Sequence, residues 1–256
     1  MTEMTIEEYE KLEPIFTLKY KNVEVLYNVP NRQTLWRAES LNSKEPDTLA
    51  WIDNFDAEDV LFDVGANVGM YSIWAAATKK CSVVAFEPEA QNYAILNKNI
   101  GLNNLRESTI AYPVALSDGT GFGDLHLSDF VIGGSCHTFG EALDHRLQPR
   151  KSWLRQGSFS TTIDRIISSK SVPFPTQIKI DVDGIEHKVI EGAKKTLKDD
   201  RVRSILVELN TNLSIHNNLI KSLERKGFRL WRETLDISIR KKGEFKGVGN
   251  HIFQRT

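Results

Sequence analysis

Acidic side chains stand where three short apolar runs of the chain end. Asp63 lies near the end of the first run, Glu87 directly follows the second, and Asp181 and Asp183 stand at the end of the third. An acid at the end of a buried strand is costly unless it meets a cation or hydrogen-bond donors. These positions therefore predict a site whose ligand offers hydroxyl, ammonium or other cationic groups.

A turn with two glycines follows the first acid. Gly65 and Gly69 let the backbone approach a ligand because neither has a Cβ atom, and Asn67 between them tolerates a positive φ angle. Glu87 comes 24 residues after Asp63, and an acid in that place can accept hydrogen bonds from the hydroxyl groups of a ribose. The turn and the acid together predict a pocket for a nucleoside-bearing cofactor.

The glycine spacing narrows the choice of cofactor. The dinucleotide fingerprint G-x-G-x-x-G needs three glycines to admit a pyrophosphate, whereas this turn reads G-A-N-V-G. The chain also has no G-x-x-x-x-G-K-[ST] motif. A ligand with a ribose but no phosphate fits better, and S-adenosylmethionine is one. A nicotinamide-dependent oxidoreductase is an alternative that the missing glycine disfavours. A nucleoside-binding module without catalysis is another, disfavoured by the acids at the pocket edge.

The elements that position these residues alternate between strands and helices from residue 58 onward. Strands are expected at 60–64, 82–86, 109–116, 177–182 and 205–209, with later strands at 228–232 and 251–254. Helices are expected between them at 69–78, 89–101, 185–197 and 214–226. This alternation predicts an α/β fold with a mostly parallel sheet covered on both faces. In such sheets the ligand binds beyond the carboxyl ends of the strands.

Two segments lie outside this alternation. Residues 1–57 are expected to form a partly helical appendage over the cofactor site, with helices at 6–12 and 45–55 and an irregular or weakly stranded stretch at 20–37. About 60 residues separate the third and fourth strands. Connections this long usually carry function or elements of their own, so we expect substrate contacts there.

The long connection contains three features of note. A hairpin strand is expected at 124–127, and a glycine turn at 133–135. The basic run 145–155 includes Trp153 and could meet an acidic glycan, a phosphate or a single-stranded nucleic acid, although such runs are more often solvated loops. A second basic run, 240–242, is expected at a hairpin tip.

The composition is that of a soluble globular protein. The chain has 256 residues and a net charge of −1, so no global field draws it to nucleic acid or to an anionic membrane. Its two cysteines, Cys81 and Cys136, show no metal-type spacing and are expected to be reduced, which suits the cytoplasm. The N-terminus lacks the pattern of a signal peptide, and no apolar run approaches the roughly 20 residues that span a bilayer.

The motifs as a set resemble the FkbM family of S-adenosylmethionine-dependent methyltransferases. The resemblance extends from about residue 45 to the end of the chain. Its most specific parts are D-V-G-A-N-V-G, starting at Asp63, and K-I-D-V-D-G-I-E, starting at Lys179. E-P-D-T at 45–48, F-E-P at 86–88, A-L-S-D at 115–118, T-I-D at 162–164 and V-E at 207–208 support it. Asp183 stands where the family more often has Glu.

The resemblance implies a fold, an activity and a set of site residues. The fold is the Rossmann-like class I methyltransferase sheet of seven strands, the last antiparallel, which would be the strand at 251–254. The activity is methylation of a hydroxyl group on a glycan, a sugar or a small natural product. The residues expected to bind the cofactor are Asp63, Gly65, Ala66, Asn67, Gly69, Tyr71, Glu87, Pro88, Ala115, Ser117, Asp118 and Asp181.

The acids after the fourth strand are the candidate catalytic residues. Alternation along the strand brings Asp181 and Asp183 to the carboxyl edge of the sheet, and Glu186 follows in the first helical turn. Asp183 and Glu186 also match a capping box, with Asp183 at the N-cap, so they can serve as a cap, in the active site, or in both. Other candidate bases are three histidines, each of which is more often a surface or packing residue: His137, His187 and His216.

A metal is a less favoured interpretation of the same edge. Asp181, Glu208 and Asn210 stand where some class I O-methyltransferases hold Mg²⁺, and oxygen ligands suit that ion. We expect no metal and a reaction that depends mainly on alignment. The sequence thus predicts a transferase with a small-molecule or glycan acceptor and no nucleic-acid partner, while the acceptor itself and the oligomeric state stay open.

Overall fold

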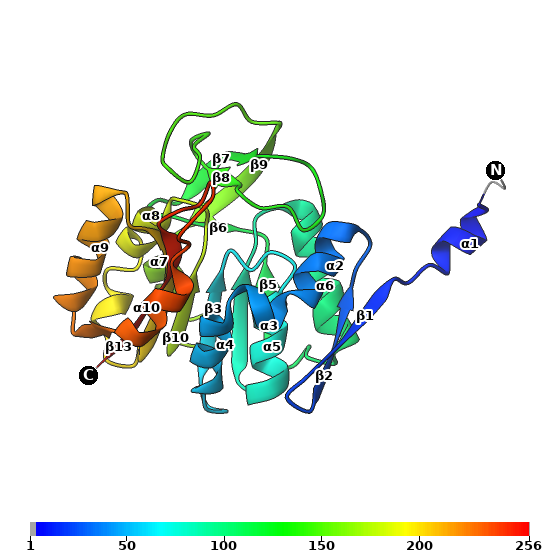
Figure 1. The fold of residues 1–256 in the computed structure, drawn as a ribbon, viewed down its shortest axis with the longest axis horizontal. Coiled ribbons are helices and arrows are strands. Elements are labelled where there is room, and N and C mark those ends of the chain that lie inside the picture. Colours follow the sequence, from blue (N-terminus) through cyan, green and yellow to red (C-terminus); the bar gives the residue numbers. More distant parts are fainter. Residues whose placement is uncertain (1–3, 256) are drawn as a thin grey trace.

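The computed structural model describes residues 4–255, apart from the side chain of Asp236. A seven-stranded sheet forms the centre, a smaller four-stranded sheet lies beside it, and an N-terminal hairpin extends to one side (Figure 1). None of the helices within residues 4–255 is long and apolar enough to cross a membrane.

The central sheet has the predicted doubly wound order. Its spatial order is β12 (Phe228–Leu230), β13 (Val248–Arg255), β11 (Ser204–Asn210), β10 (Gln177–Ile180), β3 (Val60–Val64), β4 (Ser82–Phe86) and β5 (Thr109–Tyr112). All neighbours are parallel except those of β13, which pairs antiparallel with both β11 and β12. The winding reverses between β3 and β10, and this is the class I methyltransferase sheet that the sequence predicts.

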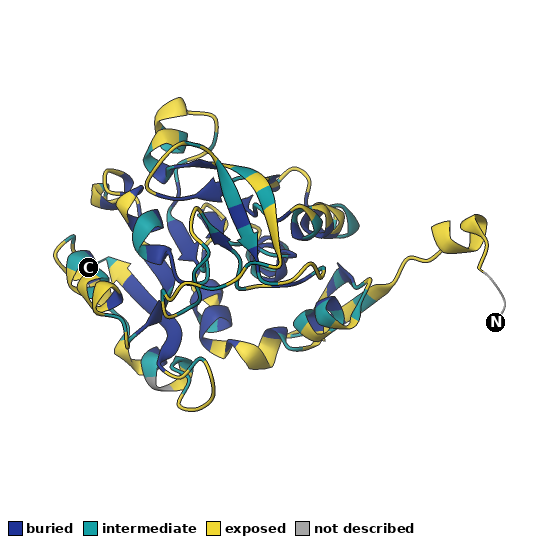
Figure 2. Ribbon diagram, turned by 90° about the horizontal axis from the view of Figure 1, so that it is seen from above, coloured by how far each residue is buried: buried dark blue, intermediate teal, exposed yellow. Residues whose placement is uncertain are grey.

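Helices cover both faces of this sheet, and the buried residues lie in the sheet between them (Figure 2). One face packs against α4 (Pro46–Asp53), α5 (Met70–Lys79) and α6 (Ala90–Leu102). The other packs against α7 (Ile163–Ser169), α8 (Glu186–Glu191) and α9 (Ser214–Glu224). Two hydrophobic clusters result, because alternate side chains of each strand point to opposite faces.

The N-terminal segment is more regular than the sequence analysis expects. α1 (Ile6–Glu10) is present, but the stretch 20–37 is neither irregular nor weakly stranded. It contains the end of β1 (Ile15–Tyr20), β2 (Val23–Asn28) and most of α2 (Arg32–Glu39), which α3 (Leu41–Lys44) follows. Two residues with positive φ, Lys21 and Asn22, make the hairpin turn without the glycine that usually marks one.

The predicted third strand, 109–116, is in fact two strands. β5 ends at Tyr112, and Pro113, which has no backbone N–H, lies in the break. The continuation, β6 (Ala115–Leu116), joins the second sheet, whose order is β6, β9 (Leu154–Thr161), β7 (Gly121–Leu127) and β8 (Thr138–Phe139). The long connection therefore has a sheet of its own, and the hairpin strand expected at 124–127 is the end of β7.

Two further predictions are wrong in detail. The helix expected at 185–197 ends at Glu191, and a separate 3₁₀ turn, η1 (Thr196–Lys198), follows. A Cβ atom at Gly192 would lie 2.1 Å from the Ser117 carbonyl oxygen, so the chain packs too closely there for a regular helix with side chains. The basic run 240–242 follows an unexpected helix, α10 (Arg232–Ser238). Arg240 exchanges backbone hydrogen bonds with Gly247 and Val248, so the run lies at the start of a hairpin turn and not at its tip.

Candidate active site

The turn after β3 is fixed by contacts that only glycine permits. Gly65 has a φ of +80°, and a Cβ atom there would lie 1.9 Å from the Asp181 carbonyl oxygen at the end of β10. Gly69 has a φ of +85°, and its Cβ would meet Leu96 of α6 at 2.4 Å. Gly65 therefore brings the turn against Asp181, whereas Gly69 serves helix packing and lines no hollow among the described residues.

Two hollows adjoin this turn and share Gly65, Asn67 and Asp181. The first encloses about 550 Å³, part of it open to solvent. Its lining includes both polar and apolar residues beyond the strand ends: Phe86, Glu87, Pro88, Val114, Ala115, Leu116, His137, Phe139, Asp183 and Ile185. The second encloses about 440 Å³ and lies toward the N-terminal segment.

Glu87 is the buried carboxylate of the first hollow. One oxygen accepts the N–H of Asn67 at 2.7 Å and the other accepts the N–H of Glu89 at 2.8 Å. Burial raises the pKa of Glu87 to about 8 although these N–H groups act in the opposite direction. Each oxygen keeps a free lone pair. The held carboxylate beside an apolar cleft therefore fits the ribose and base of a nucleoside.

A short segment of the long connection closes the first hollow. The Gly134 carbonyl oxygen accepts from the side-chain amides of Asn67 at 2.6 Å and Asn92 at 3.2 Å. Asn92 also accepts the N–H of Gly133 at 2.7 Å, and Arg37 donates its Nε–H to the Gly133 carbonyl at 2.6 Å. The glycines of this segment are evident in the sequence as a turn, whereas no motif marks Asn92 or Arg37.

The second hollow is lined by charged and polar groups. It contains the side chains of Arg37 and Lys44 from the N-terminal segment and Tyr71 from α5, beside the backbone of Ala66. Lys44 pairs with the buried Glu45 carboxylate at 2.7 Å. Of the residues expected to bind the cofactor, Ala66 and Tyr71 line only this hollow, and the N-terminal segment contributes residues that were not expected.

Lys179 is a buried cation that lines the second hollow beside Asp181. Its ammonium group lies 3.0 Å from Asp181, 4.0 Å from Asp63 and 5.3 Å from the centre of the Tyr71 ring. Burial opposes its charge, but the neighbouring carboxylates raise its pKa above the ordinary value. Asp63 also accepts from the Ser72 hydroxyl at 2.6 Å and lines neither hollow. Its position is that of a counter-charge for Lys179.

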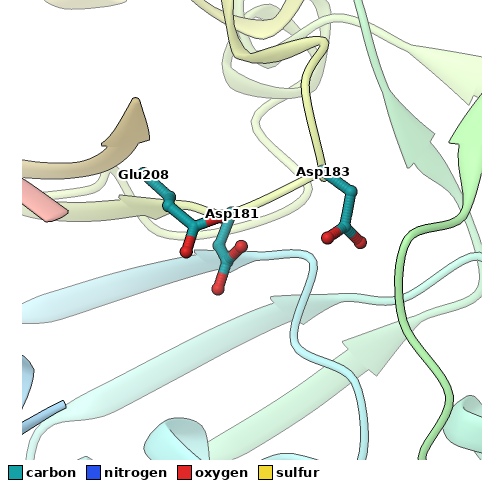
Figure 3. A group of neighbouring side chains, drawn as sticks. All are labelled: Asp181, Asp183 and Glu208. Atoms are coloured by element: carbon teal, nitrogen blue, oxygen red, sulfur yellow. The ribbon is translucent and has the colours of Figure 1, made fainter. Parts of the chain in front are cut away.

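Three carboxylates meet beside this cation (Figure 3). Asp181, Asp183 and Glu208 each offer an oxygen within 4.8 Å of the others, and Glu208 pairs with Arg240 at 3.0 Å. Burial, with the charge of Asp181, raises the pKa of Asp183 to about 6 and that of Glu208 well above its ordinary value. The cluster can accept a proton near neutral pH. Its oxygens are also a donor set that a divalent cation could use.

The capping box expected after β10 does not form. Asp183 has a φ of +60°, and its carboxylate accepts the N–H of Cys136, 47 residues away, at 2.7 Å. Glu186 is buried and lines neither hollow. It accepts the N–H groups of Val182 at 3.2 Å and Gly184 at 3.0 Å. Glu186 therefore holds the loop that presents Asp181 and Asp183, and it does not face the hollows.

Some of the other residues expected at the site line a hollow and others do not. Pro88 and Ala115 line the first hollow, whereas Ser117 and Asp118 line neither and hydrogen-bond to each other at 3.1 Å. Asn210, a candidate metal ligand, instead donates its side-chain amide to the His145 carbonyl at 3.0 Å, and its Oδ1 accepts from Asn212.

The histidines make poor bases where they stand. Among the three candidates only His137 lines the first hollow, and burial lowers its pKa to about 4. Burial also lowers the pKa of His216 to about 4, and its Nδ1 accepts the N–H of Asn210 at 2.9 Å. Burial lowers the pKa of His187 as well, and it lines neither hollow.

The basic run 145–155 is largely engaged within the protein. Arg150 donates to the carbonyl oxygens of Cys136, His126 and Leu143. Arg155 pairs with Asp124 at 3.0 Å. Arg150 therefore anchors the segment that closes the first hollow.

The sequence profile of the methyltransferase FkbM domain matches residues 63–230. The match covers more than half of the chain and contains the glycine turn, Glu87 and the acid cluster. The chain belongs to this family, as its motifs predict. It is a methyltransferase, and its cofactor is S-adenosylmethionine.

Two curated proteins are similar over most of their length. The hexuronic acid methyltransferase AglP of Haloferax volcanii is 24% identical over 187 residues, which cover 73% of this chain and 71% of AglP. The methyltransferase sdnD of Sordaria araneosa is 24% identical over 203 residues, which cover 71% of this chain and 78% of sdnD. Both are described as methyltransferases.

Solved methyltransferase structures are similar at low identity. The precorrin-6y C5,15-methyltransferase of Geobacter metallireducens is 13% identical, with a TM-score of 0.47 and coverage of 86% of this chain and 93% of that one. The tRNA m1G37 methyltransferase of M. jannaschii is 14% identical, with a TM-score of 0.47 and coverage of 95% and 57%.

Proposed function

We propose that this chain methylates the oxygen of a hydroxyl group on a sugar, a glycan or a small natural product. The carboxylate cluster of Asp181, Asp183 and Glu208 carries the proposal, because Asp181 lines both hollows, Asp183 lines the first, and members of the cluster can accept a hydroxyl proton. The relative AglP supports a sugar as the acceptor, since its description names a hexuronic acid.

The two hollows fit the cofactor by the chemistry of their donors and acceptors. Glu87 and Pro88 border the first hollow, where the nucleoside fits. The sulfur of the cofactor would then lie near the residues that both hollows share, which are Gly65, Asn67 and Asp181. When bound, S-adenosylmethionine supplies a methyl group on a positively charged sulfur, which departs as a neutral thioether. Asp181 faces this junction as a carboxylate held by Lys179 at 3.0 Å.

Asp183 is the base in this proposal. One of its oxygens is held by Cys136, and its pKa of about 6 is close to a working pH, where general bases are most effective. It takes the hydroxyl proton as the acceptor oxygen forms its bond to the methyl carbon. Alignment can contribute ~7–11 kcal/mol and a general base about 3–5 kcal/mol, so positioning by the turn and Asp181 dominates.

We also propose that the reaction takes place in the cytoplasm and that no nucleic acid takes part. Cys81 and Cys136 are free thiols, the usual state in a reducing compartment. Arg150 is engaged by backbone carbonyl oxygens and Arg155 by Asp124, which reduces the positive charge that the run 145–155 offers to a phosphate backbone.

Methyl transfer from labelled S-adenosylmethionine to a panel of neutral sugars, acidic sugars and amino compounds tests the proposal. We expect label on a sugar oxygen, and we expect Asp183→Asn to lose turnover while it still binds S-adenosylhomocysteine. Glu141→Gln, an exposed change in the long connection, is the matched control and should stay active. Label found only on nitrogen, or full activity in Asp183→Asn, would refute O-methylation with Asp183 as base.

A further inference from the structure

We propose that Arg37, supported by Lys44 and the first turn of α5, binds the α-carboxylate of the methionine part of S-adenosylmethionine in the second hollow. The N-terminal segment would then be part of the cofactor site. This inference depends on the cofactor alone and not on the identity of the acceptor.

The two hollows can be matched to the two ends of the cofactor. S-adenosylmethionine carries a nucleoside at one end, a sulfonium in the middle and an amino acid at the other end. The first hollow has the Glu87 carboxylate and an apolar cleft, which suit the nucleoside. The second adjoins it, because Gly65, Asn67 and Asp181 line both. A cofactor with its nucleoside in the first hollow therefore extends its amino acid into the second.

The second hollow contains positively charged side chains that suit a carboxylate. Arg37 uses its Nε–H for the Gly133 carbonyl at 2.6 Å, and its two terminal amino groups make no hydrogen bond or ion pair within residues 4–255. The charges of Arg37 and Lys44 both lower the pKa of Asp183, so both cations lie within electrostatic reach of that carboxylate. A planar guanidinium with two free amino groups matches a carboxylate in a bidentate geometry.

The remaining groups of the hollow complete a site for an amino acid. Met70 and Tyr71, the first residues of the ten-residue helix α5, line it, and the amino end of a helix favours an anion. Lys179 is already neutralised by Asp181 and Asp63. Asp181 keeps one oxygen that Lys179 does not hold, and this oxygen can accept from the ammonium group of the ligand.

Calorimetry with two ligands tests the assignment. S-adenosylhomocysteine has the amino acid, and 5′-methylthioadenosine has the same nucleoside and a thioether but no amino acid. In Arg37→Met we expect binding of S-adenosylhomocysteine to weaken by about 10- to 100-fold, as loss of a charged hydrogen-bond pair would produce, and we expect much less change for 5′-methylthioadenosine. Arg37→Lys should recover part of the loss.

The ratio of the affinities for S-adenosylhomocysteine and 5′-methylthioadenosine decides whether the proposal stands. Arg32→Met removes the same charge from an exposed position on α2 and should leave both affinities unchanged. A fall of tenfold or more in the preference for S-adenosylhomocysteine in Arg37→Met supports the proposal. An unchanged preference overturns it, whether both ligands weaken together through the Gly133 contact or neither weakens.

Discussion

The two hollows share one turn but are enclosed by different chemistry. Neutral amides close the first, since Asn67 and Asn92 hold Gly133 and Gly134 over it, and its charged residues are carboxylic acids: Glu87, Asp181 and Asp183. Cations line the second, where Arg37, Lys44 and Lys179 accompany Asp181. A neutral nucleoside and a zwitterionic amino acid need these two kinds of surface. The contrast teaches that the proposed cofactor site would recognise the two ends of the cofactor through different interactions, which separate substitutions can distinguish.

The largest effect is expected at Asp181, which belongs to both hollows. Asp181→Asn removes the charge that holds Lys179 and, in the proposed arrangement, faces the sulfonium, so kcat/KM should fall by roughly 10²- to 10³-fold, as loss of one electrostatic contact at a reacting centre does. Steady-state kinetics measures this fall. His137→Ala, in the first hollow only, should cost less than about tenfold, because a pKa of about 4 makes His137 a weak base. Equal losses in the two variants would contradict this ranking.

A substitution at Asn92 should distinguish the role of the first hollow from that of the second. Asn92→Ala removes the contacts to Gly133 and Gly134, at a cost of about 1–3 kcal/mol in cofactor binding. Both S-adenosylhomocysteine and 5′-methylthioadenosine should weaken to the same degree in calorimetry, unlike the selective loss expected at Arg37. Asn97→Ala, an exposed change on the same helix, is the control. A selective loss for one ligand would show that the closing segment does not act on the nucleoside.

The pH dependence of kcat/KM should follow the protonation of the Asp183 carboxylate. Because its pKa is raised to about 6, the carboxylate is protonated and inactive as a base at lower pH. The kcat/KM should therefore rise as pH increases through about 6 and then level off. This rise should be absent from the residual activity of Asp183→Asn. An unchanged acid limb in that variant would assign the titration to another group.

The smallest effect is expected from chelation. Asp181 and Glu208 already have cationic partners in Lys179 and Arg240, so a divalent cation is not needed to balance their charge. Activity in EDTA should stay within about twofold of the untreated value. Loss of activity that Mg²⁺ restores would show that the acid cluster holds a metal.

Short patterns in the sequence predicted the carboxyl edge of the sheet and many of the candidate site residues on it. The turn from Gly65 to Gly69, Glu87 and the pair Asp181 and Asp183 follow strands whose apolar runs are evident in the sequence, and parallel strands bring their ends together. Glu186 shows the limit of such reasoning. Its capping-box spacing is genuine, but the positive φ of Asp183 turns the loop so that Glu186 holds backbone N–H groups.

Residues that enclose the hollows were beyond prediction for a physical reason. Arg37 meets Gly133 across 96 positions and Asn92 meets it across 41. Neither residue stands in a motif, and each lies on a helix whose apolar periodicity says nothing of a polar partner in a distant loop. Their roles depend on how the N-terminal segment and the long connection fold against the sheet, which single-sequence periodicity does not encode.

The contact between Cys136 and Asp183 has a consequence for enzyme engineering. The long connection is the obvious segment to exchange between relatives in order to change the acceptor. Because its backbone N–H at Cys136 holds the proposed base and its Gly134 carbonyl holds Asn67, an exchanged connection would carry part of the catalytic geometry with it. A chimera that keeps these two backbone contacts should therefore inherit a new acceptor preference together with an intact reaction centre.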